Sequence, residues 1–409
     1  MVLICNNLFG QIDSKDLSDI LRPSKNKKEL NLTSELQVGK TYSSVLPFAG
    51  YGPANGFVLG AAMSISRNFG QAPTNPSSSQ INCQVTTMKQ FITNIRSELY
   101  LEKNKWYLQG DWRLLFFSQP TYGLGIVDMA NNEEIFTVNQ LSQNTEINGD
   151  PMKFNLFRFH EDAAVKMGDS HFYAGMGVSI DQHFDIVDEN LDTIVGSPDY
   201  YITPNYAYSV KNNFDPVKYG TNGVKLTLLT DTRDNTANSY KGYFASASML
   251  YNIKIGNNSQ QSYQLLYDAR YYLGLSSVNK RKVLAFWSWG SFLLHGNLPY
   301  LALPSISWDT YNRSGRGFIQ GRYRGLSMVY SEVEYRFPIS KRGLFGGDVF
   351  LNTTNASSYS QKLFDKTAVG VGGGIRLQME KQSRTNLGMD IGIGSDHSYG
   401  LYFNLQETF

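Results

Sequence analysis

Long apolar runs, cysteines and charged residues are all scarce in this chain of 409 residues. No stretch approaches the ~18 consecutive apolar residues that a membrane-spanning helix requires. The two cysteines, Cys5 and Cys83, are too few for a disulfide framework. Charged residues make up 18% of the chain, and the formal net charge of +2 gives no reason to expect a nucleic-acid partner. A helical membrane protein, a disulfide-rich domain and a nucleic-acid-binding protein are therefore all disfavoured.

Aromatic residues and glycine are abundant instead. The chain has 26 tyrosines, 24 phenylalanines and 37 glycines. Such a composition with few charges suits β-structure that contacts lipid. Because lipid cannot satisfy backbone hydrogen bonds, a β-structure that spans a membrane must close into a barrel.

Apolar residues alternate with polar residues or glycine from Gly56 to the C-terminus. In the segment 367–380, Val369 and Val371 occupy odd positions, and the even positions from 370 to 380 carry glycine, arginine, glutamine or glutamate. Strands of about ten residues with one apolar and one polar face are typical of outer-membrane barrels. We predict an all-β, transmembrane antiparallel barrel of about sixteen strands, over 56–69, 79–90, 92–102, 105–118, 132–143, 152–166, 170–186, 220–233, 242–254, 260–275, 280–295, 326–339, 343–353, 367–380, 384–394 and 398–409.

A soluble β-sandwich is the alternative fold. It predicts strands of about five or six residues, roughly half the length of the segments here. The polar faces also carry charges that a dry core does not tolerate but a wet barrel lumen does. These charged residues are Glu332, Glu334, Arg336, Asp348, Arg376 and Asp390.

The N-terminal region has a different pattern. Residues 1–11 resemble the end of a secretion signal, and an ordinary disordered terminus is the alternative. Residues 12–54 are predicted to form an extension with a short helix over 14–22, which ends before Pro23. A helix this short needs a surface to dock on, so we expect it at the mouth of the barrel or inside the lumen. The barrel itself is predicted over 55–409.

A loop rich in arginine and glycine precedes the strand at 326–339. If the last strand ends in the periplasm, the loop of residues 296–325 is extracellular. Long loops are usually functional or disordered. We predict that this one folds into the barrel and places Arg316 between Glu334 and Asp348, because guanidinium–carboxylate pairs make directional anchors. Gly315 and Gly317 would allow the sharp turn.

Several of these motifs resemble one family. Arg316-Gly317-Phe318 is similar to the Arg-Gly-Phe/Tyr tip of the lumen-inserted sixth extracellular loop in BamA/TamA-like surface-antigen barrels. The segments 231–235, 241–244, 334–339, 345–348 and 400–409 agree with the same family. One departure is Gly315, where the family usually has valine or isoleucine. The resemblance implies that Arg316, Gly317, Phe318, Glu334 and Asp348 lock the loop in the lumen.

The resemblance also implies a cellular setting. We expect the outer membrane of a Gram-negative bacterium, a periplasmic N-terminus, and contact with outer-membrane lipid and lipopolysaccharide. The barrel assembly machinery would assemble the chain, and other outer-membrane proteins would be its clients. The residues before Gly56 are too few for a POTRA domain, so the sequence is expected to be a minimal, barrel-only member.

Family members that insert proteins open between their first and last strands. Here the resemblance places this seam at Gly56, Gly60, Gly400 and Phe409, and glycines weaken strand packing. The terminal segment is also similar to the assembly signal of outer-membrane barrels, carried by Gly400, Phe403, Leu405 and Phe409. A plain amphipathic last strand is the alternative reading.

Catalysis is not expected. None of the five histidines has metal-ligand spacing or a Gly-x-Ser-x-Gly context, so we predict no catalytic residue, metal or cofactor. Two functions stay open. The barrel assists insertion or translocation of proteins or lipids through the seam, or it is a channel-forming or structural barrel, either alone or as a subunit of a larger complex.

Overall fold

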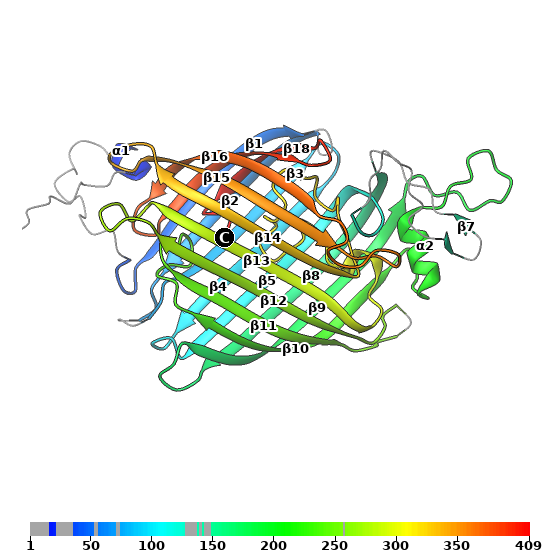
Figure 1. The fold of residues 1–409 in the computed structure, drawn as a ribbon, viewed down its shortest axis with the longest axis horizontal. Coiled ribbons are helices and arrows are strands. Elements are labelled where there is room, and N and C mark those ends of the chain that lie inside the picture. Colours follow the sequence, from blue (N-terminus) through cyan, green and yellow to red (C-terminus); the bar gives the residue numbers. More distant parts are fainter. Residues whose placement is uncertain are drawn as a thin grey trace, which may run out of the picture.

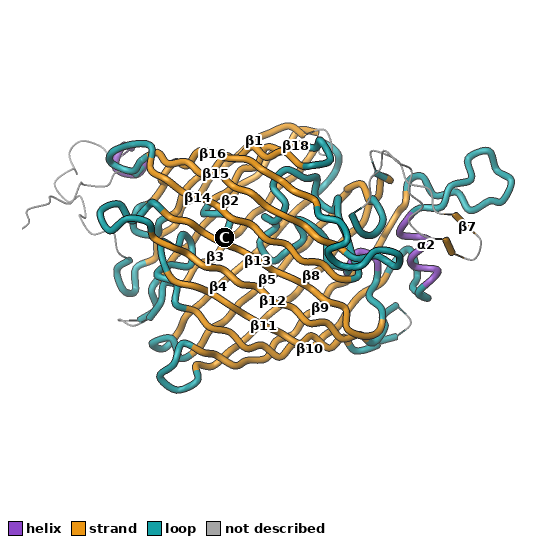
Figure 2. The backbone as a smooth tube through the Cα atoms, in the orientation of Figure 1, coloured by secondary structure: helices purple, strands orange, loops and turns teal. Residues whose placement is uncertain are grey.

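The structure of the protein is a computed structural model, and it describes residues 16–21, 36–52, 56–70, 74–126, 137–138, 141–142, 149–256 and 258–409. Sixteen antiparallel strands follow one another in chain order within a single sheet. The sheet curls into a barrel with strongly tilted strands (Figures 1 and 2). The predicted antiparallel barrel is confirmed.

The barrel strands are β1 (Thr41–Gly52), β2 (Gly56–Arg67), β3 (Ser77–Thr86), β4 (Phe91–Leu101), β5 (Trp106–Thr121), β8 (Asp150–Lys166), β9 (Phe172–Asp188), β10 (Tyr219–Asp231), β11 (Gly242–Asn252), β12 (Ser262–Gly274), β13 (Val283–Gly296), β14 (Ser327–Pro338), β15 (Phe345–Ala356), β16 (Ala368–Glu380), β17 (Thr385–Gly394) and β18 (Tyr399–Leu405). Two further strands, β6 (Thr137–Val138) and β7 (Leu141–Ser142), pair only with each other. The helical elements are α1 (Leu17–Leu21), α2 (Pro204–Lys211) and the 3-10 helix η3 (Tyr300–Ala302). None of the described helices is long and apolar enough to cross a membrane.

The two ends of the barrel differ. Helix α1 lies at one end, which we call the turn end, and α2 with β7 lies at the other, which we call the loop end (Figure 1). The connections β14–β15 and β16–β17 are short and lie at the turn end, whereas β13–β14 makes a long connection from the loop end. Both chain ends enter the sheet from the turn end, because the number of strands is even.

The strand faces differ as period-two alternation requires. Outward side chains such as Leu226, Leu228 and Leu401 are apolar and exposed, as expected for a surface that meets lipid. Inward side chains such as Glu334, Asp348 and Asp390 are charged and fully buried within the protein. The lumen is therefore filled with a polar network.

Two predicted boundaries are wrong, and the errors cancel in the strand count. The sheet begins with β1 at Thr41, inside the range 12–54 that was assigned to the N-terminal extension, so the barrel does not start at residue 55. The predicted strand 132–143 does not join the barrel, and only the small β6–β7 pair is described there. Strand β1 contains Pro47, and a proline argues against a central strand in a sequence pattern. Strand β1 is an edge strand, where proline is tolerated.

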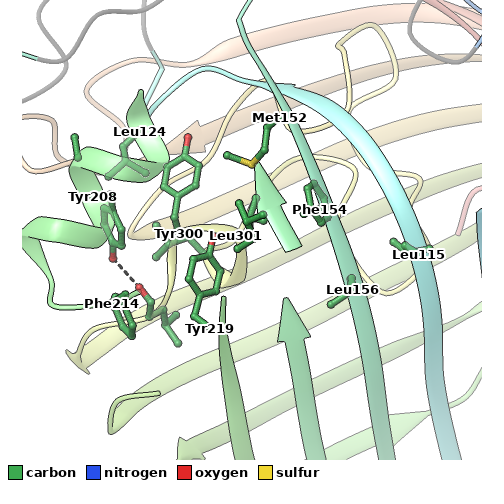
Figure 3. Packing of buried hydrophobic residues seen from close by; sticks show 14 of the residues in the cluster. Leu115, Leu124, Met152, Phe154, Leu156, Tyr208, Phe214, Tyr219, Tyr300 and Leu301 are labelled. Atoms are coloured by element: carbon green, nitrogen blue, oxygen red, sulfur yellow. Dashed lines mark hydrogen bonds between the residues drawn. The ribbon is translucent and has the colours of Figure 1, made fainter. Parts of the chain in front are cut away.

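A cluster of apolar residues covers part of the loop end. The rings of Tyr208 of α2 and Tyr300 of η3 lie 5.8 Å apart, and Leu301, Leu124 and Phe154 belong to the same cluster (Figure 3). The Tyr208 hydroxyl donates a hydrogen bond to the carbonyl oxygen of Leu298 at 2.9 Å. This cluster fixes the start of the β13–β14 connection before the chain enters the lumen.

Helix α1 docks on the β16–β17 turn. The Asp16 carboxylate accepts a hydrogen bond from the Lys381 backbone N–H at 2.9 Å, and Asp19 pairs with the Lys381 ammonium at 2.9 Å. Of the two expected positions, the described helix occupies the mouth at the turn end (Figure 1). The rest of the predicted helix 14–22, and the predicted signal remnant 1–11, lie outside the described residues.

Candidate functional site

The connection from β13 to β14, residues 297–326, folds into the lumen, and we call it the luminal loop. Most of its side chains are buried or half-buried. The Asp309 carboxylate shapes its inner turn by accepting hydrogen bonds from the backbone N–H groups of Tyr311, Arg313 and Ser314 at 2.8, 3.1 and 2.9 Å. These hydrogen bonds fix the conformation of the turn and therefore the positions of the arginines that follow it.

Arg316 lies at the tip of the luminal loop and is 1% exposed. Its Nη1 lies 3.2 Å from Asp348 Oδ2 and 2.7 Å from Asp390 Oδ2. Its Nη2 lies 2.5 Å from Glu332 Oε1 and also pairs with Glu334. The four carboxylates stand on β14, β15 and β17, so one guanidinium ties the loop to three strands.

The surroundings keep Arg316 charged. Burial alone would lower the pKa of its guanidinium, but the carboxylates, led by Glu332 and Glu334, raise the pKa well above its ordinary value. The guanidinium carbon also lies 3.6 Å from the ring centroid of Phe350, a cation–π contact.

Two further arginines from the barrel wall complete the network. Arg336 Nε lies 2.6 Å from Glu334 Oε1. Arg376 Nη2 lies 3.1 Å from Asp348 Oδ2, and its Nε lies 2.9 Å from Glu407 Oε2. A buried charge network persists only where each charge is paired, so the loop tip is strongly specified in this position.

Glycines make room for the loop tip. Gly315 and Gly317 have φ values of +77° and +112°, which ordinary residues adopt only with strain. On the facing wall, a Cβ added at Gly392 would lie 2.6 Å from the Gly317 nitrogen, and one at Gly370 would lie 2.7 Å from the Arg316 carbonyl oxygen. The loop backbone therefore lies directly against β16 and β17.

The backbone after Arg316 is held by β18 and the turn before it. Gly317 N–H donates to the Tyr402 hydroxyl at 2.8 Å, and the Ser398 hydroxyl donates to the Gly317 carbonyl oxygen at 2.6 Å. Phe318 is buried and packs edge-on against Tyr323. The tip thus contacts the last strand of the barrel as well as the carboxylate cluster.

The other three arginines of the luminal loop have separate partners. Arg322 pairs with Asp396 of the β17–β18 turn at 2.9 Å. Arg324 donates to the carbonyl oxygens of Tyr300 and Leu303 at 2.9 and 3.2 Å. Arg313 donates to the C-terminal segment, to the Leu405 carbonyl oxygen at 3.0 Å and to the Glu407 carbonyl oxygen.

The barrel has a seam between its first and last strands. Strand β1 pairs only with β2 and β18 pairs only with β17 among the described residues, and no ladder joins β1 to β18. Both strands therefore present an edge of unpaired backbone groups, which is a ready template for another strand. Figure 1 shows the two strands close together along one side of the barrel.

The C-terminus turns into the lumen beside this seam. Strand β18 ends at Leu405, and Gln406 has a φ of +80°. The Gln406 side chain donates to Ser64 of β2 at 2.7 Å, and Gln80 of β3 donates to the Leu405 carbonyl oxygen at 3.0 Å. The last residues therefore contact the lumen faces of β2 and β3.

The structure places the residues predicted for the seam and for the assembly signal in different parts of the barrel. Gly56 and Gly60 lie on β2, which has a partner on both sides, so they do not form the seam edge as predicted. Gly400 and Phe403 lie on β18, and Phe403 is 66% exposed on the outer face. Leu405 is buried, and Phe409 stacks on Trp287 inside the lumen with ring centroids 5.3 Å apart.

Sequence reasoning missed some members of the site. Glu332 and Asp390 were placed on the lumen face but not assigned to Arg316, because sequence does not show how far a loop reaches across a barrel. Glu407 carried a signal that was overlooked: it interrupts the apolar odd positions Leu401, Phe403 and Leu405. Among the described residues, no group of three or more His, Cys, Asp or Glu is arranged to hold a metal ion.

Comparison with known proteins agrees with this geometry. The Omp85 superfamily domain matches residues 136–409, more than half of the chain. BamA from Haemophilus ducreyi lacking POTRA domains 1–3 aligns with 90% of this chain and 70% of its own, at 14% identity and a TM-score of 0.51. No significant match is found among curated protein sequences.

Two CdiB structures share the fold. CdiB from Acinetobacter baumannii has 11% identity and a TM-score of 0.52 over 89% of this chain. CdiB from Escherichia coli has 10% identity and a TM-score of 0.53 over 89% of this chain. The chain spans 59% and 62% of these two proteins, less than two thirds of their length.

Proposed function

The chain belongs to the Omp85 superfamily, and from this premise we propose that it assists the insertion or translocation of proteins at the outer membrane of a Gram-negative bacterium. The working edge is the seam between β1 and β18. One observation carries the proposal: among the described residues, ladders join every neighbouring pair of barrel strands except β1 and β18. An unpaired strand edge in a membrane leaves backbone groups that a client strand would satisfy.

The proposal includes a setting and partners. The turn end faces the periplasm and the loop end faces the exterior, with lipid and lipopolysaccharide around the outer surface. Unfolded outer-membrane proteins are the proposed clients, and the barrel assembly machinery places the chain in the membrane. The family membership and the apolar outer face support this setting.

Reconstitution tests the proposal. The purified chain in liposomes should accelerate folding of an unfolded client barrel, followed by its shifted migration on an unheated gel. The control is a closed outer-membrane barrel of similar size at equal density in the same lipid. Equal client folding with both barrels would overturn the proposal.

A channel is the second candidate function. A cavity of about 230 Å³ lies between the luminal loop and the wall, and Asp111, Arg158, Asp162, Asp181 and Lys225 line it. Charged linings of this kind occur in aqueous pores. Ion conductance across a planar bilayer without any acceleration of client folding would favour this function over the first.

A further inference from the structure

We propose that Arg313 is a positioning residue of the seam, which holds the C-terminal residues 406–409 inside the lumen and so keeps the edge of β1 free. The inference rests on the proposed function only in treating that edge as the working surface. It concerns a different residue from the Arg316 anchor and a different element, the C-terminal tail.

Arg313 reaches the tail from the luminal loop. Its Nη2 donates to the Leu405 carbonyl oxygen and to Gln80 Oε1, both at 3.0 Å, and its Nη1 donates to the Glu407 carbonyl oxygen. These two carbonyl groups lie on either side of Gln406, where the backbone leaves the strand conformation. The guanidinium thus binds the bend itself.

The tail is fixed at further points in the lumen. The Glu407 side chain accepts hydrogen bonds from Arg376 Nε at 2.9 Å and from Asn386 Nδ2 at 2.6 Å. Arg336 Nη2 donates to the Phe409 carbonyl oxygen at 2.9 Å. Arg336 and Arg376 also bind the carboxylates that hold Arg316, so the tail and the loop tip share one charge network.

The sequence of β18 explains why the strand bends here. Leu401 and Phe403 occupy odd positions and face outward. A straight continuation would place Glu407 on the same lipid-facing side, and a carboxylate there is costly. The bend turns this carboxylate into the lumen, where Arg376 pairs with it at 2.9 Å.

Residues 406–409 would have different partners in the two conformations: lumen side chains when bent, and the edge of β1 when straight. Strand β1 spans Thr41–Gly52, whereas β18 covers only Tyr399–Leu405. Because β18 approaches the turn end and β1 leaves it, straightened residues 406–409 would run antiparallel to the start of β1 and could form a ladder with it. Contacts that keep the tail in the lumen therefore keep this part of the β1 edge unpaired.

Hydrogen exchange of the full chain in lipid nanodiscs tests the inference. In Arg313→Gln, the bend loses the contacts to the Leu405 and Glu407 carbonyl oxygens, and the seam-facing amides at the start of β1 should exchange more slowly, by about tenfold or more, as a ladder forms there. Arg322→Gln is the matched control, because Arg322 belongs to the same loop but pairs with Asp396 rather than with the tail. It should leave β1 exchange unchanged.

Glu407→Gln provides a second variant that leaves the loop sequence intact. It removes the carboxylate that disfavours a straight strand, so β1 exchange should slow as in Arg313→Gln. Unchanged or faster β1 exchange in both variants would overturn the inference, and slowing in Glu407→Gln alone would overturn the role of Arg313. Failure of the client-folding assay with slowed β1 exchange would instead reject the proposed function and leave the positioning role standing.

Discussion

At the residue scale, Arg316 concentrates more buried charge contacts than any other side chain of the luminal loop. Four carboxylates surround it, and each would be left with fewer partners if it were removed. Breaking a buried ion pair is costly because the remaining charge stays in a poorly solvated site.

Arg316→Ala should therefore destabilise the folded barrel by about 3–5 kcal/mol. Urea unfolding in lipid vesicles measures this loss, and protease digestion of the luminal loop provides a second readout. Arg322→Gln is the control, since among the described residues Arg322 has one carboxylate partner, the partly exposed Asp396, besides its contacts with the rings of Tyr122 and Tyr323, and this variant should lose less stability. Equal stability of Arg316→Ala and the wild type would contradict the anchoring role.

Gly317 permits a second prediction at this scale. An added Cβ would lie 2.9 Å from the Ile393 backbone at a φ of +112°. Gly317→Ala should cost roughly 1–3 kcal/mol through strain and displacement of the loop tip. Gly168 also has a positive φ, of +60°, but an added Cβ there has no atom within 4 Å.

The difference between the two alanine variants measures the close approach of the loop to the wall together with the less favourable φ of Gly317, +112° against +60° at Gly168. Gly168→Ala should lower the free energy of unfolding only through the strained backbone conformation, by about 1 kcal/mol. If unfolding experiments find the same loss for both variants, the close contact at Gly317 contributes nothing.

Sequence predicted the members of this site better than their arrangement. Alternation placed Glu332, Glu334 and Asp390 on the lumen face, and the loop rich in arginine and glycine, together with the family resemblance, pointed to Arg316. It did not reveal that four carboxylates converge on one guanidinium, because β17 is far from β14 in the sequence. Such convergence is set by barrel closure and loop depth, which no local pattern encodes.

At the element scale, the strands with regular alternation were predicted well and the ends of the sheet were not. Strands β14 to β17 have clean period-two patterns and lie close to their predicted ranges. Strand β1 contains Pro47, and β18 ends at Leu405, two residues before Glu407, whereas the predicted last strand ran to residue 409. Both irregular strands border the seam, where a complete ladder is not formed, so the weak patterns mark the edge that the proposed function uses.

Helix α1 supplies a prediction about pH. Asp19 is half-buried beside Lys381; burial would raise the pKa of its carboxyl, but the Lys381 hydrogen bond and charge outweigh this, and the pKa lies below its ordinary 3.8. A lowered pKa in the docked state stabilises docking fully above that ordinary value, and the contribution is lost as the pH falls through the lowered value.

A spin label at Ile20, which is 54% exposed on α1, measures this docking. The label should stay restricted at neutral pH and become mobile only in strong acid. Asp19→Asn should make the label mobile already at neutral pH. A label whose mobility is the same in Asp19→Asn and in the parent protein would show that this ion pair does not hold the helix.

At the scale of the whole molecule, the luminal loop packs against one part of the barrel wall, and the seam between β1 and β18 lies next to it. The luminal loop joins β14, β15, β17 and β18 through Arg316, Gly317 and their partners, which stiffens the wall next to the seam. In the part of the chain that the structure describes, no ladder joins β1 to β18 along the seam. The fold class and the inward loop were predicted from sequence. The count of sixteen strands was reached only because one missed strand and one wrongly predicted strand cancel. The edge of β1 that has no ladder among the described residues was not predicted, since it depends on the bend after Leu405.

Site-specific photo-crosslinking to a client tests the central claim most directly. A photoreactive residue in place of Val45, which is 57% exposed on β1, should capture an unfolded client barrel during its insertion. The same residue in place of Val224, which is 37% exposed on β10 in the middle of the strand order, should not. Client capture at Val45 alone is the predicted result, and equal capture at both positions, or none at Val45 while the client still inserts, would contradict the account.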